Sequence, residues 1–445
     1  MRFNQERGTM KIEKPILTPA SIERRRLVQC GVALTITSAC GLDLAKAQTM
    51  TEAAFAILDL EALDTAMAGH LAPDLPGIVT LVARNDEVRV GTHGSMATGD
   101  TRPMRRDAIF RLASITKPAS AALAMMLVED GKLALDEPVD RLLPELANRR
   151  VLKRLNRPLD ETVPAERPIL VSDLLTLRMG LGAIFSPEPH PIMTAMAELG
   201  VGVGPWLPEA ESSDAYIAKI GSLPLMHQPG AEWMYDTGLH VLGVLIERAA
   251  GKPLGEVMRE RLFDPLGMTD TGFSVPPDKL DRLPACYWRN YQTGEIEVFD
   301  PAGAESRFAR PPGFPNAAGG LLSTVDDYLR FARMMLGAAE YKGRRLLTPE
   351  SVALMTRDRI TAEQKARSVF APGFWDQYGW GLGLAISHGL TPSEPHGYGW
   401  DGGYGTSAYW NPETGLIGIL MTQRLWDSPT PPAVREDFWQ AVNAA

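Results

Sequence analysis

The sequence has few cysteines and no cysteine or histidine pattern that would bind a metal. Only three cysteines occur in 445 residues, Cys30, Cys40 and Cys286, and there is no C-x-x-C pair and no histidine cluster. A chain that has lost its first 47 residues keeps Cys286 alone, which cannot form a disulfide framework. We therefore expect no structural disulfide, no metal and no cofactor.

The sequence also lacks a membrane-spanning run and an excess of positive charge. The apolar stretch 27–42 is shorter than the roughly 18 residues that cross a bilayer. The formal net charge is −9, although the N-terminal segment is basic. Nucleic-acid binding requires a basic surface. These properties argue against a nucleic-acid partner and against stable membrane insertion, and they suit a small-molecule substrate.

The N-terminal segment has the order of a targeting signal. Arg24-Arg25-Arg26 precedes the apolar stretch, and Ala45-Lys46-Ala47 supplies small residues before Gln48. A basic region, an apolar region and a small-residue cleavage site are typical of an export signal, and the paired arginines resemble a twin-arginine signal. We expect residues 1–47 to be a signal segment of a periplasmic or secreted protein. The alternative is a disordered extension of a cytoplasmic enzyme.

Residues 48–445 are expected to form one domain with two parts. Alternating apolar residues around short turns predict β-hairpins at 78–91 and 405–422. The chain between them has mostly helical periodicity. The fold class is therefore α+β: an antiparallel sheet flanked by N- and C-terminal helices (about 51–115 and 375–445) with a large all-α insertion (about 116–374). The predicted helices cover 51–69, 115–131, 171–179, 238–250, 324–336 and 433–442.

Ser114 and Lys117 are the main candidates for chemistry. Ser114 stands where an apolar helix is predicted to begin, and residues three apart share one face of a helix. The helix N-terminus adds positive potential at the hydroxyl, and burial can lower the pKa of a lysine enough for it to act as a base. The alternative is a serine that only caps the helix. Because residues 119–128 are apolar on nearly all sides, we expect a buried helix with the lysine at its mouth.

Several motifs resemble those of the serine β-lactamase and penicillin-binding protein superfamily. Arg111-Leu-Ala-Ser114-Ile-Thr-Lys117 is similar to its S-x-x-K nucleophile motif. Leu174–Gly180 resembles the L-L-T-x-x-S-G segment, Tyr235-Asp236-Thr237 resembles Y-x-N, and Trp400-Asp401-Gly402-Gly403 occupies the place of K-T-G. The resemblance covers about residues 55–440. It is closest to class C β-lactamases and to family VIII carboxylesterases.

The resemblance implies a mechanism and the residues that carry it. Ser114 would form an acyl-enzyme, while Lys117 and Tyr235 would share the role of base. The backbone N–H groups of Ser114 and Gly403 would form the oxyanion hole. The implied substrate-binding residues are Thr237, Trp400, Asp401 and Gly402. Without Ser114, both Tyr235 and Trp400 would be interpreted as packing aromatics.

Two departures from the family pattern concern the substrate. Thr237 replaces an asparagine, so the paired donor and acceptor of an amide are missing. Trp400-Asp401 replaces lysine-threonine, which removes the cation that attracts the carboxylate of a β-lactam. Asp401 would repel that carboxylate if it faces the cleft; the alternative is that it points away from the cleft. We therefore predict a serine hydrolase that cleaves neutral short-chain carboxylic esters.

Other functions remain open on the same residues. The first alternative is a β-lactamase, D-alanyl peptidase or amidase on the same scaffold. The second is a catalytically silent cell-wall or ligand-binding relative. A Ser-His-Asp hydrolase is not indicated, because no G-x-S-x-G motif is present.

Overall fold

The computed structural model describes residues 60–185, 188–204, 210–337, 340–341, 343–368 and 370–444. These residues belong to one compact unit, 52–445. The predicted signal segment 1–47 and the beginning of the predicted helix 51–69 lie outside them. Within the described ranges every helix is too short or too polar to span a bilayer.

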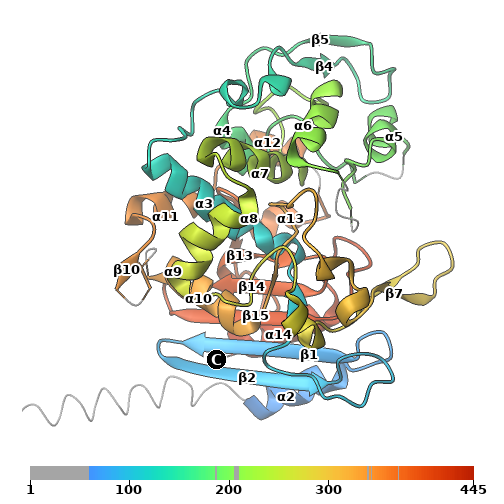
Figure 1. Ribbon diagram of the computed structural model, residues 1–445, viewed down its shortest axis with the longest axis vertical. Helices are drawn as coiled ribbons and strands as arrows, with labels where there is room; N and C mark the ends of the chain where they lie inside the picture. The colour runs from blue at the N-terminus through green and yellow to red at the C-terminus, as the bar shows by residue number, and fades with distance from the viewer. Residues whose placement is uncertain are drawn as a thin grey trace, which may run out of the picture. The chain divides into compact units, whose positions relative to one another are not determined.

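A seven-stranded antiparallel sheet joins the two ends of the described chain. Its strand order is β11-β12-β13-β14-β15-β1-β2. Strand β1 pairs with β2 in the predicted first hairpin and with β15 from the predicted second hairpin, so that Ile78 lies opposite Thr422. Figure 1 shows β1 and β2 in blue beside β15 in red. The predicted sheet built from both chain ends is confirmed. The strands are β1 (Gly77–Arg84), β2 (Glu87–Gly94), β11 (Tyr378–Trp380), β12 (Ala385–His388), β13 (His396–Gly402), β14 (Thr406–Trp410) and β15 (Leu416–Thr422).

Helices cover both faces of this sheet because neighbouring strand residues point to opposite sides. Tyr409 packs edge-on against Trp439 of α14 (Ala433–Asn443), with ring centroids 5.5 Å apart. The next residue, Trp410, packs against Phe331 of α10 (Val325–Leu336) at 5.9 Å. The terminal helix α2 (Leu60–Gly69) lies beside α14, where His70 bonds to Asp437 at 2.8 Å. The terminal helices therefore close one face, and the inserted helices close the other.

The helix that follows Ser114 lies at the centre of the inserted part. Helix α3 (Thr116–Glu129) is buried without interruption from Thr116 to Leu127, as its apolar sequence predicts. Helix α7 (Thr237–Ala250) packs against it, and α4 (Val171–Leu175) packs against α7. The helix predicted at 171–179 ends at Leu175, because Leu177 adopts a positive φ of 56° that no α-helix contains.

The insertion is not entirely helical, which corrects the sequence-based expectation. It contains three short antiparallel pairs: β4 (Arg150–Leu152) with β5 (Thr162–Pro164), β6 (Cys286–Arg289) with β7 (Ile296–Asp300), and β9 (Glu340–Tyr341) with β10 (Arg344–Arg345). A bulge at Cys286/Tyr287 breaks the two-residue alternation by which a strand is recognised in a sequence. The other elements are β3 (Phe110–Arg111), α5 (Pro191–Glu198), α6 (Ser213–Ser222), α8 (Leu254–Met258), α9 (Asp264–Leu266), β8 (Leu322–Ser323), α11 (Pro349–Met355), α12 (Ala362–Arg367) and α13 (Phe374–Gln377).

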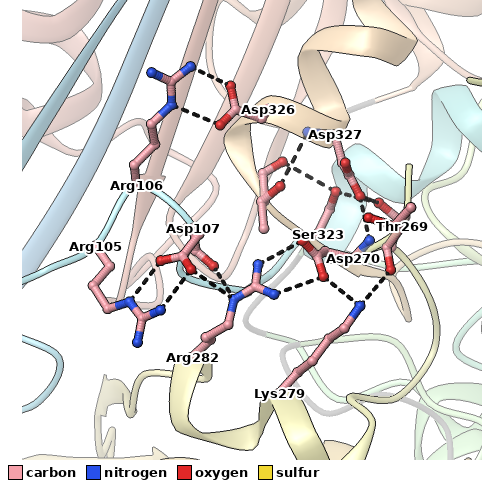
Figure 2. Close-up of polar contacts among 12 residues, drawn as sticks. Arg105, Arg106, Asp107, Thr269, Asp270, Lys279, Arg282, Ser323, Asp326 and Asp327 are labelled. Carbon is pink, nitrogen blue, oxygen red and sulfur yellow. Dashed lines mark hydrogen bonds and ion pairs between the residues drawn. The ribbon is translucent and has the colours of Figure 1, made fainter. Parts of the chain in front are cut away.

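Charged side chains fasten the segment before β3 to the inserted part. Arg282 donates to both carboxylate oxygens of Asp270, at 2.7 and 2.9 Å, and to the carbonyl oxygen of Asp107 at 2.8 Å. Arg106 makes a bidentate pair with Asp326, at 2.7 and 2.8 Å, at the beginning of α10. Figure 2 shows Arg282 between Asp107 and Asp270, and the Arg106–Asp326 pair separate from them. The chain is thus fixed on two sides a few residues before it reaches Ser114.

A buried ion pair lies on β3 itself. Arg111 Nε donates to Asp300 Oδ2 at 2.7 Å, and both side chains are almost fully buried. Arg111 also donates to the carbonyl oxygen of Pro284 at 2.8 Å, and Ser306 donates to Asp300 at 2.6 Å. Because every partner is inside the protein, this pair links β3 rigidly to β7, which ends at Asp300.

We predict that Asp300→Ala strongly destabilises the fold. It leaves the Arg111 guanidinium buried without its carboxylate, which typically costs about 3–5 kcal/mol. Urea denaturation measures the loss in the free energy of unfolding. The control is Asp281→Ala, which removes an exposed partner of Arg105 and should change stability little. Equal losses in the two variants would contradict the importance given to the buried pair.

Candidate functional site

Ser114 lies in a one-turn 3-10 helix, Ala113–Ile115, that leads directly into α3. Three buried contacts fix this turn. Leu112 donates its N–H to Leu321 at 2.8 Å, Thr406 donates its hydroxyl to the Leu112 carbonyl at 2.7 Å, and Tyr328 donates to the Ile115 carbonyl at 2.8 Å. Strand β14, helix α10 and the loop before β8 therefore all hold the nucleophile segment.

The backbone beside Ser114 has an unusual conformation. Ala113 has a φ of 46°, in the left-handed region that non-glycine residues seldom adopt. Such a residue typically stores about 1–3 kcal/mol and persists only where its surroundings enforce it. Gly402 contributes to this enforcement, because a Cβ on Gly402 would collide with the Leu112 carbonyl and the Thr406 hydroxyl. Strand β13 can approach the nucleophile only with glycine at this position.

Lys117 is completely buried, and its ammonium nitrogen contacts three oxygen atoms. Nζ lies 2.9 Å from Ser114 Oγ, 2.8 Å from the carbonyl oxygen of Ala318 and 2.5 Å from Asp236 Oδ1. Burial opposes the charge, but the attraction of Asp236 and of Tyr235 outweighs it, so the pKa of Lys117 is raised. The expectation of a lysine whose pKa is lowered by burial is therefore wrong. Lys117 is a cation that points at Ser114.

Tyr235 also meets Ser114. Its hydroxyl accepts a hydrogen bond from Trp400 Nε1 at 2.8 Å, and the nearby Ser114 hydroxyl lowers its pKa. Its ring centroid lies 4.5 Å from Lys117 Nζ. Burial raises the pKa of Tyr235, Lys117 opposes this rise, and Asp236 adds to it. The structure thus brings together Ser114, Lys117, Tyr235 and Trp400, as the motifs predict. Donors from two sides suit a phenolate oxygen that takes the Ser114 proton.

Asp236 and His240 belong to the site but did not figure among the predicted residues. Asp236 precedes α7 and contacts Lys117 with one oxygen and His240 Nε2 with the other, at 2.8 Å. Lys117 and His240 overcome the effect of burial and hold the pKa of Asp236 far below its usual value. The spacing of four residues, which places both side chains on one helical face, was the available signal.

Two of the residues expected to bind substrate do not face the cavity. Thr237 is buried at the first turn of α7, and neither Thr237 nor Gly402 is among the described residues that line the cavity. Thr237 is turned inward because the helix begins there, and Gly402 touches the Leu112 segment instead. The structure therefore does not bring these two residues together with the others at the cavity. Trp400 and Gly403 do line the cavity, beside Ser114.

Asp401 lines the cavity, but its carboxylate is engaged within the protein. It accepts hydrogen bonds from Ser407 at 2.5 Å, from Tyr409 at 3.2 Å and from the buried Arg435 at 3.1 and 3.3 Å. Asp401 follows Trp400 on one strand, so the two side chains leave opposite faces. The expectation that a free Asp401 carboxylate repels an anion is therefore wrong.

The cavity over Ser114 has a volume of about 480 Å³. This size is ordinary for a small-molecule site. Its described lining contains no lysine, arginine or histidine side chain. Elsewhere in the described ranges, no group of three histidine, cysteine or acidic side chains is arranged to hold a metal. Aromatic residues dominate the lining, among them Phe185, Tyr235, Tyr291, Phe370, Phe374, Tyr378, Trp400, Tyr404 and Trp426.

Known proteins resemble this chain over most of its length. The Beta-lactamase family model matches residues 62–441. Protein Rv1367c of Mycobacterium tuberculosis is 41% identical over 362 residues, which are 79% of this chain and 87% of that protein. Esterase EstB of Burkholderia gladioli is 31% identical over 384 residues, 80% of this chain and 88% of EstB. The solved structure of EstCE1, described as a hydrolase with promiscuous acyltransferase activity, matches with a TM-score of 0.70 at 22% identity and covers 88% of this chain and 100% of that one.

We predict that Gly402→Ala lowers the reactivity of Ser114, because the added Cβ pushes β13 away from the Leu112 turn. A displacement of about 1 Å at such a site commonly costs about 10²-fold in rate. The rate at which a fluorophosphonate probe labels Ser114 measures the effect. The matched control is Gly69→Ala at the end of α2, whose Cβ would meet nothing within 4 Å and which lies away from the site. Unchanged labelling in Gly402→Ala would contradict the prediction.

Proposed function

The chain belongs to the Beta-lactamase family, and on this premise we propose that it cleaves neutral carboxylic esters with short acyl chains. One observation carries the proposal. Lys117 and Tyr235 converge on Ser114 beneath a cavity whose described lining offers no basic side chain. An esterase relative of similar length, EstB, supports the reaction class.

In the proposed reaction, Ser114 is the nucleophile and Tyr235 exchanges its proton. The Tyr235 phenolate takes the hydroxyl proton as Ser114 Oγ bonds to the ester carbonyl carbon. Tyr235 then returns this proton to the alcohol oxygen as the carbon–oxygen bond breaks. Water repeats the sequence and releases the acid. Lys117 remains an ammonium that stabilises the phenolate and orients Ser114. The backbone N–H groups of Ser114 and Gly403 are proposed to hold the oxyanion.

The preference for neutral substrates rests on the cavity wall. An anionic substrate entering a largely apolar cavity loses hydration, and it needs a cation in return. Lys117 is buried beneath Ser114 and already pairs with Asp236, and Arg435 pairs with Asp401 and Glu394. Trp400 presents an indole N–H that is directed at Tyr235. The absence of a free cation, rather than repulsion by Asp401, is the reason for expecting weak recognition of carboxylates.

The same wall argues against the alternatives that retain the chemistry. β-Lactams and peptidoglycan stem peptides carry a carboxylate, for which the described lining has no counter-charge. A silent relative is disfavoured by a different observation, since Lys117 donates to Ser114 at 2.9 Å and lies 4.5 Å from the ring centroid of Tyr235.

We predict fast cleavage of p-nitrophenyl butyrate and little turnover of nitrocefin by the purified protein. Ser114→Ala should lower the ester rate by about 10³-fold or more, since the nucleophile is lost. Lys117→Ala is a poorer test, because it leaves a largely buried Asp236 carboxylate without its cation and endangers the fold. Retained activity in Ser114→Ala would exclude Ser114 as nucleophile, and dominant nitrocefin turnover would refute the proposed substrate class.

The charge preference has its own matched pair of substrates. p-Nitrophenyl butyrate and the p-nitrophenyl monoester of succinic acid share the leaving group and a four-carbon acyl chain, and only the succinate carries a negative charge. We predict that kcat/KM for the succinate is lower by about tenfold or more, because its carboxylate is desolvated without a partner. Hydrolysis of both esters by hydroxide supplies the correction for intrinsic reactivity. Equal values after this correction would contradict the prediction.

A further inference from the structure

A closed ring of buried contacts runs from Lys117 through α7 and back. Asn316 Oδ1 accepts the backbone N–H groups of Ala318 and Gly319, at 2.8 and 3.0 Å. These two bonds fix the orientation of the amide, so its NH₂ group faces His240 Nδ1 at 3.5 Å. Asn316 and His240 are both nearly inaccessible to solvent. The ring therefore begins with an amide that has only one orientation.

The amide orientation determines which nitrogen of His240 carries the proton. Because Nδ1 faces a donor, it presents its lone pair, and the proton lies on Nε2. Nε2 therefore donates to Asp236 Oδ2 at 2.8 Å. The other oxygen of Asp236 lies 2.5 Å from Lys117 Nζ, and Lys117 donates to Ala318, whose own N–H is bonded to Asn316. Each member is thus oriented by the one before it.

We propose that the Asn316–His240–Asp236 chain is a positioning device that keeps Lys117 an ammonium during turnover, so that Tyr235 and not Lys117 takes the Ser114 proton. This inference rests on the proposed function, since it concerns how the same site divides the work between its two candidate bases. Asn316, His240 and Asp236 act through Lys117 and are not themselves assigned contacts with substrate.

Charge balance is the physical reason. A neutral Lys117 could accept the Ser114 proton through its lone pair, but the Asp236 carboxylate would then remain largely buried with only a neutral imidazole as partner. The negative charge of Asp236 therefore holds the proton on Lys117.

The same charge acts on Tyr235 in the opposite direction. The titratable groups that face Asp236 are Lys117 from α3, Tyr235 beside it, His240 on α7 and Tyr216 on α6. Burial raises the pKa of Tyr216 well above its usual value, so it stays neutral. Asp236 opposes the formation of a Tyr235 phenolate, while Lys117 favours it. Removing the charge of Asp236 should therefore lower the pKa of Tyr235.

The test is the pH profile of kcat/KM for p-nitrophenyl butyrate with Asp236→Asn. The base must be deprotonated, so activity falls on the acid side, and we expect this limb to move to lower pH by about one unit or more. The control is Asp327→Asn, which removes a buried carboxylate on α10 that bonds to Arg330 and Thr271 away from the site and should leave the limb in place. A uniform loss of activity with an unmoved limb, or a shift to higher pH, would overturn the proposal.

A second readout separates this inference from the proposed function. The pH dependence of Ser114 labelling by a fluorophosphonate probe reports the same base without any ester turnover. If labelling shifts as expected while no ester is cleaved, Asp236 acts on the base as proposed and the esterase proposal fails. Because Asp236 raises the pKa of both Lys117 and Tyr235, the protonation of Lys117 decides which of the two is the base. If esters are cleaved but neither limb moves, the device fails alone.

A measurement on the unaltered protein tests the proposal even if the Asp236→Asn variant does not fold. The ¹³Cε chemical shift of Lys117, assigned by its absence in Lys117→Met, reports the protonation of that amine. We expect it to stay constant across the pH range in which activity rises. A titration of Lys117 with the midpoint of the activity limb would identify Lys117 as the base and overturn the proposal.

Discussion

The buried ammonium of Lys117 is the interaction on which the rest of the structure depends. Lys117 belongs to a helix whose residues 116–127 are all buried. A buried charge is tolerated only when polar or charged partners lie close to it. The partners come from three places in the chain: the turn at Ser114, the loop at Ala318 and the beginning of α7 at Asp236. These three segments must all contact Lys117 Nζ, so the same contacts determine both the fold and the arrangement of the site.

The loop at 316–321 shows how this constraint spreads. Successive turns of α3 bind it through Thr116 and Ser120 as well as Lys117: the Leu321 N–H donates to the Thr116 hydroxyl at 3.2 Å, and Ser120 donates to the Ala317 carbonyl at 2.7 Å. Polar side chains of the buried helix α3 thus bind the loop and fix its orientation, which apolar packing alone could not do. The loop also carries Asn316, so its position determines the orientation of His240. The arrangement of the candidate site therefore depends on a loop to which no catalytic residue is assigned.

Local sequence patterns predict the structural features that depend on residues close together in the chain. They do not predict contacts between segments that are far apart in the sequence. The hairpins at both ends, the buried helix after Ser114 and the pairing of Ser114 with Lys117 all follow from spacing within a few residues. The contact between Tyr235 and Trp400 could be predicted only from the family resemblance. The part played by Asn316 was not predictable, because it depends on a loop that packs against α3 and α7. Asp401 differs from these residues. Strand alternation alone implies that the side chains of Trp400 and Asp401 face opposite sides, so the sequence itself contained a reason to expect that Asp401 does not repel an anion.

Trp400 and Asp236 together are the basis of the proposed preference for neutral esters. A tyrosine base needs stabilisation of its phenolate, and a cation at the cavity wall would supply it while also attracting carboxylates. Here the indole N–H of Trp400 donates to Tyr235 without carrying a charge. The one cation near Ser114 is matched by Asp236, so the pair presents no net positive charge to the cavity. A proton can therefore move between Ser114 and Tyr235 in surroundings that give an anionic substrate no advantage. Burial raises the pKa of Tyr235, Lys117 opposes this rise and Asp236 adds to it, so the proposed reaction is expected to become faster as the pH increases.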